Sequence, residues 1–310
     1  MYDLVIIGAG PAGITASIYA ARKGMDFIVA SEDVGGQAAW SGDIENYTGY
    51  QFITGSELAL KFEEHMRKFS IKLRDNEKVI SLNNADNIIQ VKSNKETYSA
   101  RTVIIASGKR SRELNVQGER EFKNKGLTYC ATCDGPLFAG KDVAVIGAGN
   151  SALNAALQLE KIARHIYIIN INPRLGGDAI MREKVESGNI MSILNNTQVT
   201  AVLGDKFVNA IKIKRLQPQI KAANGTDREE VISVQGVFVE IGLIPNSEFA
   251  QYIEKNELGE IKVNCRNETN MAGIFAAGDV TDVAEKQIVI AAGEGAKAAL
   301  SAFRYLIQQK

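Results

Sequence analysis

The sequence predicts an α/β protein made of two three-layer domains, each with a β-meander. Two short β-branched runs, residues 4–7 and 143–146, each lead into a glycine-rich turn and then into a helical stretch. A second apolar run follows each helix, at residues 27–30 and 166–169. Parallel strands need a crossover helix between them, so each of these units is typical of a parallel sheet with helices on its face.

The segments after each unit alternate between apolar and polar residues, as antiparallel strands do. Residues 79–91 and 208–239 show this pattern around Asn, Asp and Gly turns, and we expect a β-meander in each place. Residues 102–106 resemble a strand that returns to the first sheet. A last strand at 273–277 and a helix at about 291–307 cannot bury their own faces, so they must complete a sheet begun elsewhere.

Length, charge and hydropathy exclude several classes of protein. A chain of 310 residues is long enough for two domains. Its 36 basic and 36 acidic residues balance, which argues against binding to nucleic acid. No apolar run approaches the ~20 residues of a membrane helix, and the N-terminus opens directly into a strand pattern, so we expect a cytoplasmic protein. The only histidines, His65 and His165, stand apart from other metal ligands, and we predict no metal site.

The first glycine motif is Gly8-x-Gly10-x-x-Gly13. Gly8 permits a tight turn, Gly10 lets the backbone approach a pyrophosphate, and Gly13 allows the helix to pack closely on the strand. Free N–H groups and the helix dipole favour the anion. A tight turn without a ligand is the alternative, but the flanking strand and helix favour a dinucleotide site. Glu32, after the second strand, is a candidate for its ribose.

The second motif, Gly147-x-Gly149-x-x-Ala152, is the variant with alanine in third place. Two such turns predict two Rossmann-like domains and two dinucleotides, and a flavin with a nicotinamide is the obvious combination. At the end of the following strand an acid would select NADH and a basic cluster NADPH. Residues 170–174, with the sequence Asn-Ile-Asn-Pro-Arg, offer neither cleanly.

Cys130 and Cys133 form a Cys-x-x-Cys pair just before the second strand–turn–helix unit. Two thiols at this spacing can close a reversible disulfide, and a lowered thiol pKa makes one of them a better nucleophile. A zinc site would need a second pair about fifteen to twenty residues away, and the chain has none. Asp134 can pass protons to the dithiol or cap a turn. Cys265 lies outside every motif, and we expect a structural role for it.

Two dinucleotide motifs with a redox Cys-x-x-Cys between them resemble the low-molecular-weight thioredoxin reductases. The resemblance runs along the whole chain and is closest to the flavoprotein of alkyl hydroperoxide reductase. That flavoprotein has an additional N-terminal thioredoxin-like domain, whereas this sequence begins at the first glycine motif. The resemblance therefore implies a separate thioredoxin- or glutaredoxin-like partner. Further matching motifs are Gly35-Gly36-Gln37, Ile44-Glu45-Asn46-Tyr47, Ala106-Ser107-Gly108, Ile241 to Asn246, Gly278-Asp279-Val280 and Lys286-Gln287-Ile288.

The resemblance also implies a domain organisation and a set of cofactor contacts. A discontinuous FAD-binding domain comprises residues 1–111 and 245–310, and an NAD(P)H-binding domain, 112–244, is inserted into it. FAD would contact Gly8, Gly10, Pro11, Ala12, Gly13, Glu32, Gly36, Gln37, Asn46, Ala106, Gly108, Gly278, Asp279, Lys286, Gln287 and Ile288. The nicotinamide dinucleotide would contact Gly147, Gly149, Asn150, Ser151, Asn170 and Arg174.

By the same resemblance, Cys133 faces the flavin, Cys130 attacks the partner's disulfide, and Asp134 is the acid. The protein would be a homodimer whose domains rotate about the crossings near Ser111 and Ile244. NADPH-dependent members carry a His-Arg-Arg run and a further arginine; the matching positions here are Asn170, Ile171, Asn172 and Gly176. The three arginines are missing, which favours NADH slightly, although Arg174 is near enough in sequence to substitute.

Other functions stay open at this point. One is an NADH oxidase or a reductase linked to a peroxiredoxin, another is a disulfide reductase that takes its electrons from a ferredoxin, and a third is a dinucleotide-binding sensor without activity. The run from Lys109 to Arg112 is either a docking patch for an acidic carrier or, more often for such a run, a solvated surface.

Overall fold

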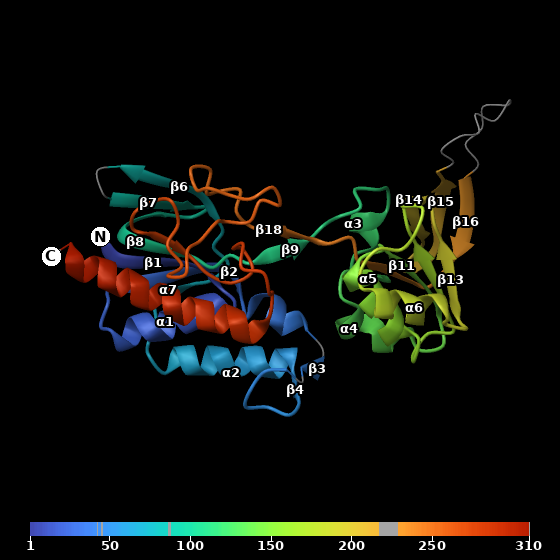
Figure 1. Ribbon diagram of the computed structural model, residues 1–310, viewed down its shortest axis with the longest axis horizontal. Coiled ribbons are helices and arrows are strands. Elements are labelled where there is room, and N and C mark those ends of the chain that lie inside the picture. The colour runs from blue at the N-terminus through green and yellow to red at the C-terminus, as the bar shows by residue number, and fades with distance from the viewer. Residues whose placement is uncertain (42, 45, 86–87, 217–228, 310) are drawn as a thin grey trace. The chain divides into compact units, whose positions relative to one another are not determined.

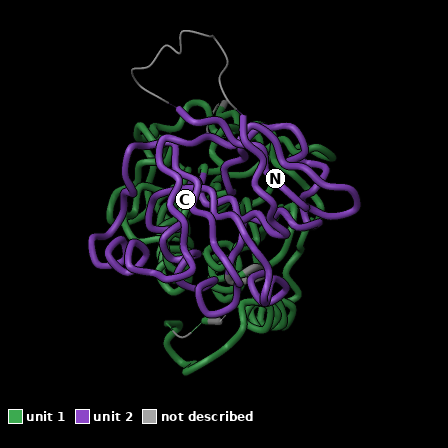
Figure 2. Tube along the Cα trace, turned by 90° about the vertical axis from the view of Figure 1, so that its right-hand side faces the viewer, with its two compact units in different colours: residues 1–110, 244–310 green, residues 111–243 purple. Residues whose placement is uncertain are grey.

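The computed structural model describes residues 1–310 except 42, 45, 86–87, 217–228 and 310, and the side chains of five further residues, Trp40, Asp43, Ala85, Thr132 and Cys133, lie outside the description. The chain forms two compact units (Figure 2). Unit 1 consists of Met1–Arg110 and Ile244–Lys310, and unit 2 of Ser111–Leu243. Strands β9 (Lys109–Ser111) and β18 (Leu243–Pro245), which pair with each other, carry the chain between the units. Each unit boundary lies one residue before the predicted domain boundary.

Unit 1 is built on a seven-stranded sheet of order β5-β2-β1-β8-β7-β6, with β19 paired to β8. Strand β1 pairs in parallel with β2 and β8, whereas β6, β7 and β8 form the antiparallel meander. The strands are β1 (Tyr2–Ala9), β2 (Phe27–Val34), β5 (Leu73–Arg74), β6 (Val79–Ala85), β7 (Ile88–Ser93), β8 (Thr97–Ile105) and β19 (Ile274–Ala276).

The apolar run of β1 is buried on both faces of this sheet. Leu4 and Ile6 pack with helices α1 (Pro11–Arg22) and α7 (Ile288–Gln308), which lie side by side (Figure 1). Val5 and Ile7 point to the other face, against the meander and residues 250–280. The predicted C-terminal strand and helix thus complete the first sheet, as expected. Helix α2 (Gly55–Arg67), the 3-10 helix η1 (Gly36–Trp40) and the short strands β3 (Asp43–Ile44) and β4 (Ile53–Thr54) complete the unit.

Unit 2 repeats this plan with a five-stranded parallel sheet of order β10-β17-β11-β12-β13. Val143 and Val145 pack with helix α5, while Ala144 and Ile146 pack against the three-stranded meander β14-β15-β16. The strands are β10 (Leu127–Thr128), β11 (Asp142–Ile146), β12 (His165–Ile169), β13 (Met191–Leu194), β14 (Thr197–Gly204), β15 (Val208–Arg215), β16 (Glu229–Ser233) and β17 (Gly236–Val239). The helices are α3 (Glu119–Phe122), α4 (Ala131–Asp134), η2 (Gly135–Phe138), α5 (Asn150–Leu159) and α6 (Ala179–Glu186).

The structure confirms the α/β class and corrects the bounds of several elements. The second meander begins earlier than predicted, at β14, and residues 236–239 leave it to pair in parallel with β11 and β10. The predicted turn at Asn224-Gly225 lies outside the described residues. Helices α1 and α5 begin directly after the second glycine of each motif, because Gly10 and Gly149 are the N-cap residues.

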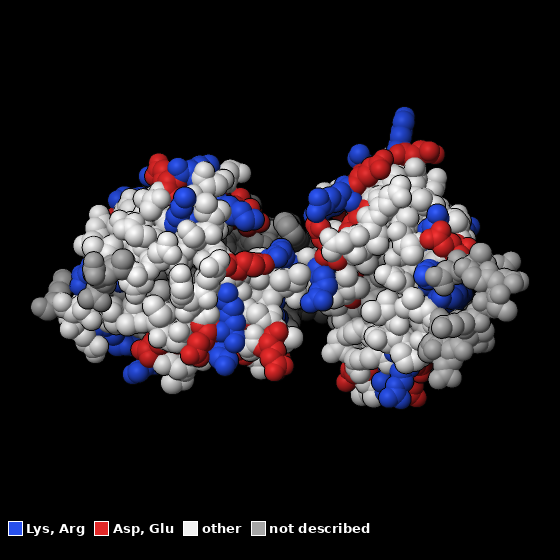
Figure 3. All heavy atoms as spheres, turned by 90° about the horizontal axis from the view of Figure 1, so that it is seen from above, with Lys and Arg blue, Asp and Glu red and all other residues white. Residues whose placement is uncertain are grey.

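In Figure 3, Lys and Arg lie among Asp and Glu on both units, without a continuous field of one sign. Among the helices described, none is both long enough and apolar enough to cross a membrane.

Candidate functional site

The first glycine turn brings β1, α1 and β8 into direct backbone contact. Gly8 has φ +102°, and a Cβ on it would lie 2.4 Å from the Ala106 carbonyl oxygen. A Cβ on Gly13 would lie 1.8 Å from the carbonyl oxygen of Gly8. Gly10 is different, because its nearest neighbour would be the Cα of Gly36, 4.0 Å away. Gly8 and Gly13 are therefore required for packing, whereas Gly10 faces open space.

The helices that follow the predicted dinucleotide motifs start without a side-chain cap. This is true of α1 at Gly10, of α5 at Gly149 and of α7 at Gln287. By contrast, Thr54 caps α2 and Asp178 caps α6 through their side-chain oxygens. Uncapped N–H groups at the positive end of a helix form a site for phosphate. The residues present thus fit two dinucleotides, one in each unit.

Several predicted FAD contacts of unit 1 converge on the start of α1. A Cβ on Gly36, which has φ +53°, would lie 3.2 Å from the Cα of Gly10. A Cβ on Gly278 would lie 3.0 Å from the Cβ of Ala12 and 3.5 Å from that of Ala291, so Gly278 sits between α1 and α7. Pro11 is the first residue of α1, where the lack of an N–H costs nothing.

Other predicted contacts are joined by hydrogen bonds within unit 1. Asn46 Nδ2 donates to Gln287 Oε1 at 3.0 Å, and Gln37 Nε2 donates to the Lys109 carbonyl at 2.9 Å. The carbonyl of Gly108 accepts the N–H of Asn246 at 2.9 Å. Ile288 begins α7 and packs on an apolar cluster formed by Ile44, Ile53 and Leu58.

The end of β2 presents two acids. Glu32 is exposed and pairs with Lys78 at 3.3 Å, so its carboxylate is accessible to a ribose. The neighbouring Asp33 is also exposed, and partial desolvation followed by repulsion from Glu32 raises its pKa. Ser31 fixes the turn, because its Oγ accepts the N–H of Ala9 at 2.9 Å and donates to the Asp33 carbonyl at 2.6 Å.

A buried charge cluster that the sequence did not reveal lies beside Asp279. Glu260 accepts hydrogen bonds from Lys109 Nζ at 2.7 Å and from Asn256 Nδ2 at 2.6 Å, and Lys286 Nζ lies 3.1 Å from it. Burial raises the pKa of Glu260, but these donors more than offset it and lower the pKa to about 2. Burial raises the pKa of Asp279, and the positive charges of Lys286 and Lys109 oppose that shift. Lys109 is therefore an internal ion-pair partner, neither a docking residue nor a solvated one.

The second glycine turn, in unit 2, has the same geometry as the first. A Cβ on Gly147, which has φ +141°, would lie 2.1 Å from the Glu240 carbonyl oxygen and 3.1 Å from the Cβ of Ala152. A Cβ on Gly149 would meet no described atom within 4 Å. Ser151 is exposed in the first turn of α5, whereas Asn150 uses its Oδ1 to accept the N–H of Asp178 at 2.7 Å.

The loop after β12 contradicts part of the expected role of Asn170. Its side chain is 1 % exposed, donates to Asn195 Oδ1 at 2.9 Å and accepts the N–H of Asn172 at 2.9 Å. This side chain shapes the loop and does not face a ligand. Ile171, Asn172 and Arg174 are exposed beside it.

Cys130 lies directly before the short helix α4 and is disulfide-bonded. Its N–H donates to Thr128 Oγ1 at 3.2 Å, and Thr128 Oγ1 in turn donates to Asp134 Oδ2. The Thr128 hydroxyl thus bridges the Asp134 carboxylate and the backbone N–H of Cys130. The side chain of Cys133 lies outside the described residues. Cys265, expected to be structural, is a free and exposed thiol.

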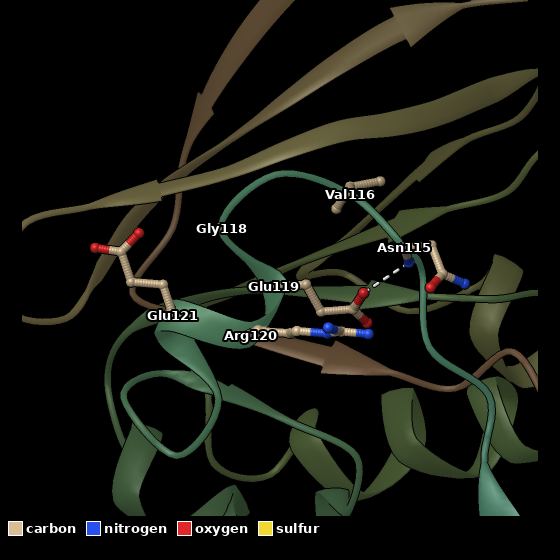
Figure 4. Close-up of a pocket in the computed structure, with 6 residues that line it drawn as sticks. All are labelled: Asn115, Val116, Gly118, Glu119, Arg120 and Glu121. Carbon is tan, nitrogen blue, oxygen red and sulfur yellow. Dashed lines mark hydrogen bonds between the residues drawn. The ribbon is translucent and has the colours of Figure 1, made fainter.

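A buried carboxylate holds the chain leading to Cys130. Glu119, 2 % exposed, accepts the N–H groups of Leu114 and Asn115 at 2.6 Å each and the hydroxyl of Tyr129 at 2.8 Å. Burial, followed by this bond to Glu119, raises the pKa of Tyr129. Glu119 lines a hollow of about 430 Å³ together with Arg120 and four other residues, which Figure 4 labels. No residue of the glycine turns lines this hollow. Glu119 already accepts three hydrogen bonds, from Leu114, Asn115 and Tyr129.

Glu240 is a second acid that sequence reasoning missed. It follows β17, its N–H donates to the Ile146 carbonyl at 2.8 Å, and its carboxylate accepts the N–H of Ala131 at the start of α4. Burial raises the pKa of Glu240 to about 7, and the bond from Ala131 opposes this only in part. The available signal was a charged residue closing the otherwise apolar run of residues 236–239.

Comparison with known proteins shows which proteins this chain resembles in sequence. Residues 2–295 match the model of the pyridine nucleotide-disulphide oxidoreductase family. The chain is 41% identical over 308 residues to an NADH dehydrogenase of Bacillus subtilis, covering 99% of this chain and 59% of the relative. It is 40% identical over 314 residues to a component of the alkyl hydroperoxide reductase of Escherichia coli, covering 100% and 59%. The chain thus spans about three fifths of the length of these relatives.

Solved structures resemble the whole chain. Thioredoxin reductase of T. acidophilum is 37% identical with a TM-score of 0.79, covering 98% of both chains. Thioredoxin reductase of Lactococcus lactis is 30% identical with a TM-score of 0.82, covering 99% of this chain and 100% of the other. These matches imply that the chain binds FAD and NAD(P)H, in agreement with its two uncapped glycine turns. The chain therefore belongs to the pyridine nucleotide-disulphide oxidoreductase family.

Proposed function

We propose that this chain is an FAD-dependent disulfide reductase that passes electrons from NAD(P)H through the Cys130–Cys133 disulfide to a disulfide of a thioredoxin- or glutaredoxin-like protein. The observation that carries the proposal is the disulfide-bonded Cys130 in the same compact unit as an uncapped glycine turn. A reversible disulfide beside a nicotinamide site is the arrangement needed to turn a hydride into a pair of thiols.

Unit 1 is the proposed FAD domain. The N-terminus of α1 and the backbones of Gly10 and Gly36 hold the pyrophosphate, while Glu32 and Asp279 take hydroxyl groups of the cofactor. When bound, FAD accepts a hydride and gives up two electrons. The Asn46–Gln287 hydrogen bond fixes the uncapped start of α7, whose positive dipole would stabilise negative charge on the cofactor when it is bound.

Unit 2 is the proposed nicotinamide domain. The turn at Gly149 and the start of α5 hold the pyrophosphate. Ile171 and Asn172 are exposed and uncharged, so the loop offers Arg174 alone among residues 170–174 as a cation for a 2′-phosphate. We infer a preference for NADH on this basis.

The dithiol carries the last step. Reduction breaks the sulfur–sulfur bond and leaves two thiols. The Cys130 thiolate then attacks the partner's disulfide, and the partner sulfur that leaves takes a proton. The resulting mixed disulfide is resolved by Cys133. Asp134, bonded to Thr128, supplies a carboxylate at this place. A homodimer in the cytoplasm stays a prediction of the sequence.

A second candidate function is an NADH oxidase or a peroxide-linked reductase. The names of the B. subtilis and E. coli relatives favour it. In that case electrons leave to oxygen or to a peroxiredoxin. A ferredoxin-type donor is a further alternative, because a ferredoxin-flavin thioredoxin reductase of Clostridium acetobutylicum is 30% identical with a TM-score of 0.54.

Anaerobic titration of the purified flavoprotein with NADH and NADPH, followed by flavin absorbance, tests the first half of the proposal. Bleaching by NADH at lower concentration than NADPH is expected. If neither nucleotide bleaches a flavin that dithionite reduces, the nicotinamide step is wrong.

The second half is tested with Cys130→Ser and thioredoxin as acceptor. We expect the variant to lose thioredoxin reduction while its flavin is still bleached by NADH. Aerobic NADH consumption that is equal in the variant and the wild type, with no thioredoxin reduction in either, supports the oxidase instead. Cys265→Ser is the matched control, since that thiol is free and exposed.

A further inference from the structure

The loop from β12 to α6 folds back onto the second glycine turn. The Gly176 N–H donates to the Ala148 carbonyl at 2.9 Å, and the Asp178 N–H donates to Asn150 Oδ1 at 2.7 Å. Gly177, with φ +75°, lies so close that a Cβ on it would be 2.5 Å from the same Asn150 oxygen. This end of the loop is therefore fastened both to the glycine turn and to the first residue of α5.

The folded-back loop brings an acid to the proposed nicotinamide site. In sites of this kind a carboxylate accepts a hydroxyl of the adenosine ribose when the ligand is NADH. Asn170, at the end of β12, turns its amide inward and does not supply one. Asp178 is the only acid among residues 170–178, and its N–H is bonded to Asn150, next to the open position at Gly149. The acid thus reaches the start of α5 through the course of the loop.

Only one oxygen of the Asp178 carboxylate is used within the protein. Its Oδ1 accepts the N–H groups of Ile180 at 2.9 Å and Met181 at 3.2 Å, and so caps α6. Among the residues that the structure describes, none donates to Oδ2, and no lysine or arginine forms an ion pair with the carboxylate. The side chain is exposed. One oxygen and the negative charge are therefore available to a ligand at the start of α5.

Capping of α6 does not by itself require an acid. Asn caps a helix as well as Asp does, because the cap is a hydrogen-bond acceptor that needs no charge. A negative charge beside a dinucleotide has two further effects: it strengthens a hydrogen bond from a ribose hydroxyl, and it repels the 2′-phosphate of NADPH. The charge at this position therefore discriminates between the two nucleotides, whereas the cap does not.

We propose that Asp178 is the residue that makes the nicotinamide site selective for NADH. Its free carboxylate oxygen accepts a hydroxyl of the adenosine ribose, and its charge repels the 2′-phosphate of NADPH. The hydrogen bond to Asn150 holds the acid at the start of α5. This role rests on the proposed function, since it requires the nicotinamide dinucleotide to bind at α5.

Binding of NAD⁺ and NADP⁺ to the FAD-loaded full chain tests this role. The oxidised nucleotides bring no hydride, so neither the flavin nor the disulfide is reduced during the titration. Calorimetric titration gives the Kd of each nucleotide and hence the ratio of the two affinities. In the wild type we expect NAD⁺ to bind more tightly than NADP⁺.

Asp178→Asn keeps the cap of α6 and removes only the charge. We expect the ratio to shift at least about tenfold in favour of NADP⁺, because the ribose loses a charged acceptor and the 2′-phosphate is no longer repelled. The melting temperature should equal that of the wild type. Asp178→Ser, a second uncharged cap, should behave in the same way. Glu186→Gln removes the same charge from the exposed last residue of α6 and should leave the ratio unchanged.

An unchanged ratio in Asp178→Asn and Asp178→Ser would reduce Asp178 to a helix cap and overturn the proposal. So would an equal shift in Glu186→Gln, or a wild type that prefers NADP⁺. If neither nucleotide binds the wild type, both this proposal and the nicotinamide step of the proposed function are wrong. Failure to reduce thioredoxin would count against the proposed function alone, because no carrier protein enters the titration.

Discussion

Asn46 and Gln287, 241 positions apart, are joined by a 3.0 Å hydrogen bond from Asn46 Nδ2 to Gln287 Oε1. The bond fixes the loop after η1 to the N-cap residue of α7. The Gln287 side chain therefore bonds to the loop and does not cap the helix, so the first N–H groups of α7 stay available to a ligand. This hydrogen bond joins the two sequence segments of unit 1, Met1–Arg110 and Ile244–Lys310, at the proposed flavin site.

We predict that Asn46→Ala weakens FAD binding with little effect on folding. The bond is exposed, and loss of a hydrogen bond of this kind costs about 0.5–1.5 kcal/mol, or roughly two- to tenfold in Kd. Titration of the apoprotein with FAD measures the change. Asn94→Ala, which removes an exposed bond to the Lys78 N–H elsewhere in unit 1, is the control. Equal FAD affinities in the two variants would contradict the assignment.

Gly149→Ala is expected to block the nicotinamide dinucleotide without unfolding unit 2. A Cβ there meets no described atom within 4 Å, so the added methyl group points into the space assigned to the ligand. We expect the Kd for NADH to rise at least about tenfold, which corresponds to about 1.4 kcal/mol, while the melting temperature stays unchanged. Asn154→Ala, at an exposed position of the same helix, should bind NADH normally. Calorimetric titration measures both.

Glu260→Gln should destabilise unit 1, because it leaves the partly buried Lys109 and Lys286 without their carboxylate. Removal of one partner from a buried ion pair costs about 3–5 kcal/mol. The pKa of Glu260 is lowered to about 2, so its stabilisation is complete above the ordinary pKa of a glutamate and is lost as the pH falls toward 2.

Urea unfolding at pH 7 and pH 3 measures this difference. The destabilisation by Glu260→Gln should be larger at pH 7 than at pH 3. Glu248→Gln removes an exposed pair with Arg110 and should cost less than about 1 kcal/mol. A cost for Glu260→Gln that is no greater than this control would refute the buried cluster.

Glu240→Gln should change the pH dependence of stability in the opposite sense. The pKa of Glu240 is raised to about 7, so the stability associated with its proton is complete below the ordinary pKa and is lost as the pH rises through 7. Relative to the wild type, the variant should gain up to about 3 kcal/mol between pH 5 and pH 8.5. Urea unfolding of the two proteins at both pH values gives the difference, with Glu230→Gln as a control that should show none.

The double variant Ile171→Arg, Asn172→Arg should shift nucleotide preference toward NADPH. Both positions are exposed, so the new guanidinium groups can reach a 2′-phosphate without disturbing the core. We expect kcat/KM for NADPH to rise about tenfold relative to NADH, or about 1.4 kcal/mol. Arg174→Ala should lower whatever NADPH activity the wild type has. An unchanged ratio in the double variant would place nucleotide selection outside this loop.

The glycine turns were predictable because their chemistry is local. Gly8 and Gly147 need positive φ, and Gly8, Gly13 and Gly147 need close backbone approach, so the pattern of residues reports the geometry directly. The place of strand β17 could not be predicted, because a short apolar run has the same pattern in a meander and in a buried parallel sheet. Its parallel pairing with β10 and β11 places it in the five-stranded sheet.

Charged residues were hard to place for a related reason. Glu260, Lys109 and Lys286 are far apart in sequence and meet only in the folded unit. Asn170 stands where a ligand contact was expected, yet its neighbours Asn172 and Asn195 turn its amide inward. Spacing along a chain identifies a turn, but it does not show which way a polar side chain will point.

The interruption of unit 1 by unit 2 has a consequence for biosynthesis. Strand β19 and helix α7 belong to unit 1 but leave the ribosome after unit 2, which is one continuous segment, Ser111–Leu243. Until α7 arrives, the face of α1 that packs against it stays uncovered. Unit 2 can therefore fold first, before the N-terminal segment has its partners β19 and α7. A nascent chain arrested before β19 should hold a protease-resistant middle segment between two digestible arms.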